Sequence, residues 1–179
     1  MSFTGLDKYR MKFDGSDDGV FASESVSFDI TQAITLAAWV LPVTINGDLH
    51  ILGRDDGTNR NYKLGTDSSK YRFDFFSGGS TKSAISSTAP VKGKWALIVG
   101  TYDNALNADN HIIYYDGTAE TIDDENGDIA IDNDDVLFSI GRRASSSGFT
   151  PWDGSIGQCA VWNTALTDSE VSTLYASGD

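Results

Sequence analysis

The chain has 179 residues, and its 13 Lys and Arg stand against 26 Asp and Glu, which gives a formal net charge of −13. A charge of this sign argues against DNA, RNA and anionic membrane surfaces as partners, because all three would repel the protein. The single cysteine, Cys159, excludes an internal disulfide framework and a cysteine-rich zinc site. A hydrophobic content of 40% is sufficient for a packed core.

The N-terminal residues 1–8 contain no basic stretch followed by an apolar one, so we do not expect a secretory signal there. No apolar run approaches the ~20 residues of a membrane-spanning helix, and we expect no membrane insertion. We predict a short N-terminal segment over residues 1–8 and one domain over residues 9–179. Phe3 and Leu6 give the segment two apolar side chains with which it could dock as an arm on a partner.

Apolar residues recur with a period of two along most of the chain, which is typical of β-strands. The clearest strands are predicted at residues 34–40, 71–75, 95–99, 111–115, 136–140 and 156–162. Shorter apolar runs predict further strands at residues 11–13, 26–30, 49–52, 62–64 and 129–131. Asp116 and Gly117 predict a tight hairpin turn. Ten or more strands at this spacing indicate an all-β sandwich.

One helix is predicted near the C-terminus. Thr167 and Glu170 have the spacing of a capping box, in which each side chain bonds the backbone N–H of the other residue. Val171, Leu174 and Tyr175 then provide one apolar face at helical spacing.

Four blocks of sequence follow one another in a characteristic order: residues 13–20, residues 34–42, residues 94–103 with 113–117, and residues 139–141 with 152–157 and 161–171. In this order they resemble a laminin-G-like domain of the concanavalin A-like lectin/glucanase class. The last block is also similar to pentraxins. The resemblance implies a two-sheet antiparallel jelly-roll sandwich with one short C-terminal helix. It does not imply one function, because the same scaffold carries lectins, glycosidases, adhesion modules and virion components.

The acidic residues argue against an enzyme. Retaining glycosidases of this fold place two carboxylates ~5–5.5 Å apart on one strand face, in the pattern Glu-x-Asp-x-Glu. Glu120, Asp123 and Glu125 have the wrong parity to share a strand face. His50 and His111 lie in predicted strands without metal-ligand spacing, so we expect structural roles for both. We therefore predict no catalytic residues and no required cofactor.

Structural calcium is the cofactor that the sequence leaves open, because aspartate-rich loops can supply hard oxygen ligands. The candidate metal ligands are Asp14, Asp55, Asp56, Asp103 and Asp153, with Asp17, Asp123 and Asp124 as further candidates. Solvated acids are the more frequent interpretation of such residues. The pentraxin resemblance places calcium ligands after the strand at residues 137–141, but here Arg142 and Arg143 follow it. This departure argues against a pentraxin-type double-calcium site.

The loop at residues 142–152 is our first candidate contact surface for a partner or a glycan, and residues 1–8 are the second. Arg142 and Arg143 are adjacent at a strand end, so at least one should be exposed. They could bind a carboxylate of a neighbouring subunit, although pairing with acids of the same chain is the simpler interpretation. Phe149 and Trp152 complete this candidate set, because Trp152 alone among the four Trp lies beside a long loop.

The recognition fold, the acidic surface and the lack of an export signal together predict a non-enzymatic virion surface protein. The leading hypothesis is a phage capsid decoration protein, made in the host cytoplasm, whose jelly roll attaches to capsid or other virion proteins and could also bind glycans. It could act alone or as a small homo-oligomer. The alternative is a stand-alone carbohydrate-binding or adhesion module of a secreted bacterial protein, located outside the cell.

Overall fold

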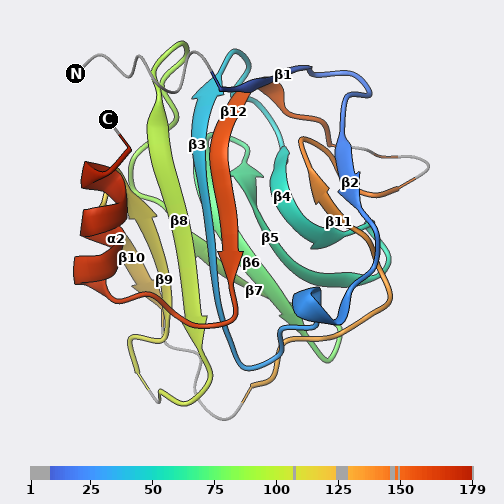
Figure 1. Cartoon of the computed structure of the whole chain (residues 1–179), viewed down its shortest axis with the longest axis vertical. Helices are drawn as coiled ribbons and strands as arrows, with labels where there is room; N and C mark the ends of the chain where they lie inside the picture. The colour runs from blue at the N-terminus through green and yellow to red at the C-terminus, as the bar shows by residue number, and fades with distance from the viewer. Residues whose placement is uncertain (1–8, 107, 124–128, 146–147, 149, 179) are drawn as a thin grey trace.

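Two antiparallel sheets of six strands each form the molecule, which we describe from a computed structural model over residues 9–106, 108–123, 129–145, 148 and 150–178. The strands of the first sheet, in spatial order, are β1 (Met11–Asp14), β12 (Asp153–Trp162), β3 (Ala33–Pro42), β8 (Ala96–Asp103), β9 (His111–Tyr115) and β10 (Thr118–Asp123). Those of the second sheet are β2 (Val20–Ala22), β11 (Phe138–Ile140), β4 (His50–Asp55), β5 (Arg60–Asp67), β6 (Lys70–Ser77) and β7 (Ser80–Ile85). The chain alternates between the sheets from β1 to β4 and again from β10 to β12, whereas β4 to β7 and β8 to β10 are each neighbours within one sheet (Figure 1). The predicted jelly-roll sandwich is confirmed.

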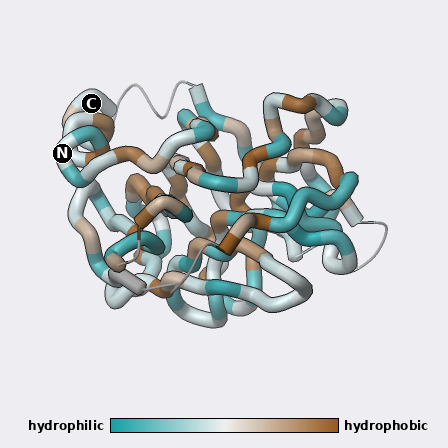
Figure 2. The backbone as a smooth tube through the Cα atoms, turned by 90° about the horizontal axis from the view of Figure 1, so that it is seen from below, coloured by the Kyte–Doolittle hydropathy of each residue, from teal (hydrophilic) through white to brown (hydrophobic). Residues whose placement is uncertain are grey.

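The core lies between the sheets and is built from alternate residues of the central strands. In β6, for example, Tyr71, Phe73 and Phe75 point inward and are fully buried, while Arg72 and Asp74 point the other way. Hydrophobic and hydrophilic residues therefore alternate along the backbone instead of forming separate blocks (Figure 2). This is the pattern that one buried face of a strand requires.

The predicted central strands are confirmed, and two of the shorter predictions are wrong. Residues 26–30 contain a 3₁₀ helix, η1 (Val26–Phe28), capped by the Ser25 side chain, which accepts a hydrogen bond from the Ser27 N–H. Residues 129–131 form no strand, although the Ile131 N–H donates to the Thr31 carbonyl. No strand range was predicted for β2, β7 or β10. All three are edge strands, β2 and β7 of the second sheet and β10 of the first, and a strand paired on one side needs less apolar patterning.

The C-terminal helix α2 (Asp168–Ala176) lies outside the sandwich, against the outer face of the first sheet (Figure 1). The Thr167–Glu170 capping box is present as predicted. Trp39 of β3 stacks on Tyr175 with ring centroids 5.6 Å apart, and Val171 of the helix is fully buried against the sheet. Within the described residues, neither helix has the length and apolar character needed to cross a membrane. The predicted arm at residues 1–8 lies outside the described residues.

Candidate functional site

A row of paired residues crosses the outward face of the second sheet. The strand register brings together, from one edge to the other, Phe21, Ser139, Gly53, Lys63, Asp74 and Ser83. Lys63 follows Tyr62 and precedes Leu64, both of which belong to the core, so the alternation of β5 directs Lys63 outward. Lys63 and Asp74 are directly opposite each other on neighbouring strands, where oppositely charged side chains attract.

The loop between β3 and β4 closes over this face because Gly65 has no side chain. A Cβ atom at Gly65 would lie 2.3 Å from the Leu49 carbonyl oxygen, so only glycine allows the loop to pass this close to β5. Thr66 fixes the loop on both sides of Asp48. Its hydroxyl donates to the Gly47 carbonyl at 2.8 Å, and its backbone N–H donates to the Leu49 carbonyl at 2.9 Å. The loop therefore delivers Asp48 to the sheet.

Six charged side chains meet where the loop reaches the sheet, and we call them the Lys63 cluster: Asp48, Asp55, Lys63, Arg72, Asp74 and Arg143. The Lys63 Nζ lies 2.6 Å from Asp48 Oδ1 and 3.8 Å from Asp74 Oδ2. Arg72 reaches Asp74 at 2.8 Å. These ion pairs hold the donors and acceptors of the cluster in fixed positions.

Arg143 enters the cluster from the loop that follows β11. Its Nε lies 3.0 Å from Asp55 Oδ2, and its second guanidinium nitrogen lies 3.2 Å from Asp48 Oδ2. Arg60 also pairs with Asp55, at 3.3 Å, and its guanidinium lies over the ring of Phe76, 4.2 Å from the centroid. With 29% of its side chain exposed, Arg60 forms the accessible rim beside the cluster.

Burial and pairing shift the pKa values of the cluster in opposite directions. Burial lowers the pKa of Lys63, and the nearby Asp74 and Asp48 offset only part of this effect. Burial likewise raises the pKa of Asp74, against the pull of Arg72 and Lys63. For Asp48, burial would raise the pKa, but Lys63 and Arg143 together hold it below its ordinary value. Asp48 is therefore a firmly ionised carboxylate.

The predicted contact residues do not come together as one surface. Arg143 joins the Lys63 cluster and pairs with acids of its own chain, in line with the simpler interpretation. Arg142 lies over the ring of Phe21 at 4.7 Å and donates to the Ser145 carbonyl. Trp152 is fully buried in the core, so it has no surface to offer a partner, and its predicted role is corrected. The reason is that residues 150–152 pack against β4 and β11, where the His50 N–H bonds the Thr150 carbonyl. Phe3, Leu6 and Phe149 lie outside the described residues.

The predicted metal ligands are dispersed over the fold. Asp55 belongs to the Lys63 cluster and pairs with two arginines, Arg60 and Arg143. Asp56 accepts hydrogen bonds from the backbone N–H groups of Thr58 and Asn59, which closes its own turn. Asp103 accepts one from the backbone N–H of Ala105. Asp14 and Asp153 are opposite each other in the β1–β12 pair, and Asp153 accepts a hydrogen bond from the residue 44 hydroxyl. These contacts account for Asp55, Asp56, Asp103 and Asp153 without a metal. Asp123 ends β10, and Asp124 lies outside the described residues.

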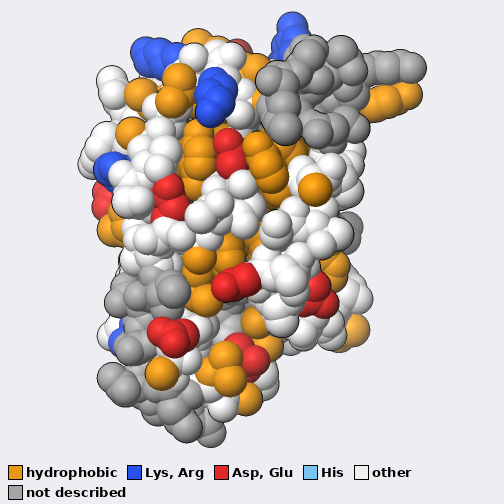
Figure 3. Space-filling view, turned by 90° about the vertical axis from the view of Figure 1, so that its left-hand side faces the viewer, with side chains coloured by type: hydrophobic (Ala, Val, Ile, Leu, Met, Phe, Trp, Pro, Cys, Tyr) orange, Lys and Arg blue, Asp and Glu red, His pale blue; other side chains and the backbone are white. Residues whose placement is uncertain are grey.

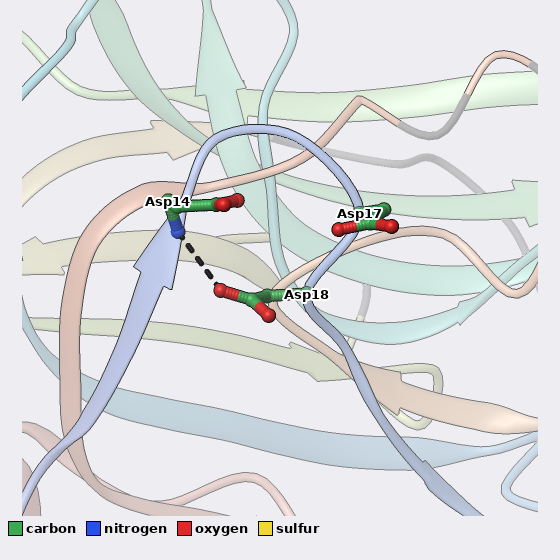
Figure 4. Close-up of side chains that lie close together, drawn as sticks. All are labelled: Asp14, Asp17 and Asp18. Carbon is green, nitrogen blue, oxygen red and sulfur yellow. Dashed lines mark hydrogen bonds between the residues drawn. The ribbon is translucent and has the colours of Figure 1, made fainter.

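One group of acids in the described part of the chain has the spacing of a cation site. Carboxylate oxygens of Asp14, Asp17 and Asp18, all exposed, lie within 4.8 Å of one another (Figure 4). The turn after β1 brings them together, and the Asp14 N–H donates to Asp18 Oδ2 at 3.1 Å. Three hard oxygen donors could hold calcium, and Asp14 and Asp17 were both candidates from the sequence. Asp18 was missed, although an acidic pair directly after a Gly-containing turn is a visible signal.

A second candidate surface lies between α2 and the outer face of the first sheet. A hollow of about 180 Å³ is lined there mainly by apolar residues, including Trp39, Trp162, Cys159 and Leu174. On the flank that carries α2, hydrophobic side chains reach the surface between polar and acidic ones, and most of the visible Lys and Arg gather toward one end (Figure 3). Burial raises the pKa of Cys159, so this thiol is a poor nucleophile.

Of the six residues in the Lys63 cluster, only Asp55 and Arg143 were predicted as site residues from the sequence. The signal was present, because Lys63 and Asp74 each interrupt a strand whose neighbouring residues are aromatic or aliphatic. A charge between inward-pointing apolar residues must face outward, and two such charges on paired strands indicate a cross-strand pair. Asp48 could not be recognised in this way, since it lies in a loop.

Comparisons with known proteins agree with this architecture. The sequence profile of a laminin G family, described as the concanavalin A-like lectin/glucanases superfamily, matches residues 14–172. No curated protein matches the chain. Among solved structures, the native heptameric SAP-like pentraxin from Limulus polyphemus is 16% identical with a TM-score of 0.62, over 93% of this chain and 81% of the pentraxin chain.

Two other solved structures are, by their descriptions, a sialidase CBM40 in complex with a glycan and the binding domain of a neurotoxin. The CBM40 of the Ruminococcus gnavus IT-sialidase, bound to α2,3-sialyllactose, is 12% identical with a TM-score of 0.71, over 93% of this chain and 97% of that one. The binding domain of botulinum neurotoxin serotype G is 16% identical with a TM-score of 0.70. The match covers 93% of this chain but 42% of the toxin domain, so the chain spans less than half of its length. At these identities the similarity establishes the fold.

Proposed function

Because the chain belongs to the concanavalin A-like lectin/glucanases superfamily, we propose that it is a non-catalytic glycan-binding module. The observation that carries the proposal is the outward face of the second sheet. There, carboxylate acceptors alternate with ammonium and guanidinium donors, and ion pairs fix their positions. Vicinal hydroxyl groups of a sugar need such adjacent, oriented donors and acceptors.

Arg60, with 29% of its side chain exposed, supplies the part of this face that is open to a ligand, and the buried ring of Phe76 lies beneath it. The guanidinium lies over the ring and is held from the side by Asp55, so its direction is set before a ligand arrives. A preorganised donor loses little conformational entropy on binding. We therefore place the glycan across Arg60, next to the Lys63 cluster.

Binding is proposed in preference to hydrolysis because of the protonation states of this face. A glycosidase needs one carboxyl group that carries a proton near neutral pH and a second that is ionised. Neighbouring cations lower the pKa of Asp48 and Asp55, against the effect of burial, so neither holds a proton. Asp74 has a raised pKa, but it is fully buried beneath the cluster.

A glycan array followed by titration calorimetry tests the proposal. We expect saturable binding to a subset of glycans, and at least a ~10-fold loss of affinity in Arg60→Ala, because a stacked and paired arginine is a typical binding hot spot. Lys94→Ala is the matched control: Lys94 also lies over an aromatic ring, 5.9 Å from the centroid of Tyr115, and near a carboxylate, 3.9 Å from Asp116. Equal losses in both variants, or no glycan binding by the folded protein, would refute the proposal.

The virion placement, the capsid partner and the homo-oligomer that the sequence predicted remain predictions, as does the alternative of a secreted adhesion module. Co-sedimentation with virus shells that lack the protein tests the first of these. Saturable binding at fixed stoichiometry, insensitive to free sugar, would support decoration of a capsid. Binding that free sugar abolishes would support adhesion through the glycan face instead.

A further inference from the structure

The carboxylate of Asp48 lies at the convergence of three cations. Its oxygens are 2.6 Å from Lys63 Nζ, 3.2 Å from the Arg143 guanidinium and 3.8 Å from that of Arg72. The acid is more exposed than the cations: 39% of the Asp48 side chain is exposed, against 0% for Lys63, 12% for Arg143 and 16% for Arg72. The cations form a recessed seat, and the acid closes it from the solvent side.

Without Asp48, the seat would carry one uncompensated positive charge. Lys63, Arg72 and Arg143, with Arg60 at the rim, supply four positive charges, and Asp55, Asp74 and Asp67 supply three negative ones. Arg143 and Arg60 share Asp55, Lys63 and Arg72 share Asp74, and Arg72 also lies near Asp67. The remaining charge matches one monovalent anion, and Arg143 presents the planar guanidinium that pairs well with a carboxylate.

Asp48 can leave the seat without moving the loop. The residues on each side of it are bonded to Thr66: the Leu49 N–H donates to the Thr66 hydroxyl at 3.1 Å, and that hydroxyl donates to the Gly47 carbonyl at 2.8 Å. The backbone is thus anchored, and rotation of the exposed side chain is enough to open the seat. Side-chain rotations of this kind are fast and need no refolding.

We propose that the Lys63 cluster is a carboxylate-binding seat in which Asp48 acts as a built-in competitor, and that its ligand is the carboxylate of an acidic sugar. This inference rests on the proposed glycan-binding function and names its substrate class. The acidic sugar places its carboxylate against Lys63, Arg72 and Arg143 after Asp48 swings out. An intramolecular competitor keeps the seat closed in most molecules, so the apparent association constant equals that of the open seat multiplied by the open fraction. A seat that is closed in 99 of 100 molecules therefore binds about 100-fold more weakly than an open one.

Calorimetric titration with 3′-sialyllactose and with lactose tests the seat, using the wild type, Asp48→Asn and Asp67→Asn. Asp67 is the matched control: it is an acid of similar side-chain exposure, 41%, which lies 3.8 Å from Arg72, and its replacement removes the same charge. We expect Asp48→Asn to bind sialyllactose at least ~10-fold more tightly than the wild type, with no change for lactose. Asp67→Asn should behave as the wild type does.

Three results would overturn the inference: no gain in Asp48→Asn, an equal gain in Asp67→Asn, or an equal gain for lactose. Lactose 3′-sulfate is the third ligand, and an equal gain for it would overturn the assignment to a carboxylate. Adding Arg143→Ala to Asp48→Asn should abolish the gain, and a gain that persists would place the anion elsewhere.

A measurement on the unmodified chain covers the case in which Asp48→Asn does not fold. Excess N-acetylneuraminate should shift the amide resonances of Gly47, Leu49 and Gly65 in the wild type, and excess lactose should not. Unchanged resonances would overturn the inference. The proposed function can fail independently of the seat. If the wild type binds neutral glycans but Asp48→Asn shows no gain for sialyllactose, only the seat is refuted. If Asp48→Asn gains affinity for sialyllactose but the wild type binds no glycan on the array, only glycan binding by the wild type is refuted.

Discussion

Acidification should destabilise this protein through its two buried histidines. Burial, together with the neighbouring Lys63 and Arg143 and against the opposing effect of Asp55, lowers the pKa of His50 from 6.5 to about 3. Burial also lowers the pKa of His111, to about 4, with a small contribution from Lys82. Both side chains are therefore neutral in the folded state at a pH where the unfolded chain binds protons.

The direction and size of the effect follow from this difference. A histidine with a depressed folded pKa contributes nothing above pH 6.5, and it costs stability as the pH falls from 6.5 toward the folded value. At pH 5, each histidine lies ~1.5 pH units below its unfolded pKa and costs about 2 kcal/mol, so the two together cost about 4 kcal/mol. This sum does not depend on the folded pKa values as long as both lie well below 5.

Urea unfolding followed by tryptophan fluorescence at pH 7, 6 and 5 measures this loss. His50→Gln and His111→Gln are the test variants, because glutamine does not titrate and can still bond the carbonyls that accept from each ring, those of Ser139 and Phe73. Each variant should lose only about half as much stability as the wild type between pH 7 and pH 5, whatever its stability at pH 7. The reasoning is refuted if both variants retain the full pH dependence, or if the wild type loses less than about 1 kcal/mol.

Three further predictions concern packing, capping and reactivity. Gly100→Ala should destabilise the fold by about 3 kcal/mol, because the new Cβ would lie 2.2 Å from the Phe73 ring. In a double-mutant cycle measured by urea unfolding, Phe73→Leu should recover at least ~1 kcal/mol of this loss, and strictly additive effects would contradict the clash. Thr167→Ala should cost about 1 kcal/mol through loss of its side of the capping box with Glu170, and unchanged stability would show that α2 does not need this cap. Cys159 should react with a thiol reagent much more slowly in the folded protein than in urea, because burial raises its pKa; equal rates would show that it is accessible.

Local patterns were enough for the central strands and the helix. In β3, β6 and β8 the alternation of apolar residues reports one buried face, and this signal is contained within each strand. The capping box at Thr167 and Glu170 is equally local, because both bonds close within one turn. The Asp116–Gly117 turn, with φ of 48° and 79°, was readable for the same reason.

Residues 26–30 show where such patterns mislead. Their apolar residues alternate like a short strand, but the Ser25 cap bends the chain into η1, which places Phe28 against Phe138 with ring centroids 4.7 Å apart. Trp152 was similarly misassigned to a surface, because proximity to a loop in the sequence says little about burial. Its packing depends on β4, which lies far from it along the chain, and on how the loop after β11 folds back.

The sequence alone therefore determined the fold class, the inward face of each central strand and the outward direction of Lys63 and Asp74, since each depends on neighbours one or two residues away. The tertiary structure decided which charges meet. Asp48, Lys63 and Arg143 come from two loops and a strand, and they converge because Gly65 lets one loop cross the sheet and β11 ends where Arg143 can reach Asp55. Such convergence depends on contacts between distant segments, and no local periodicity records them.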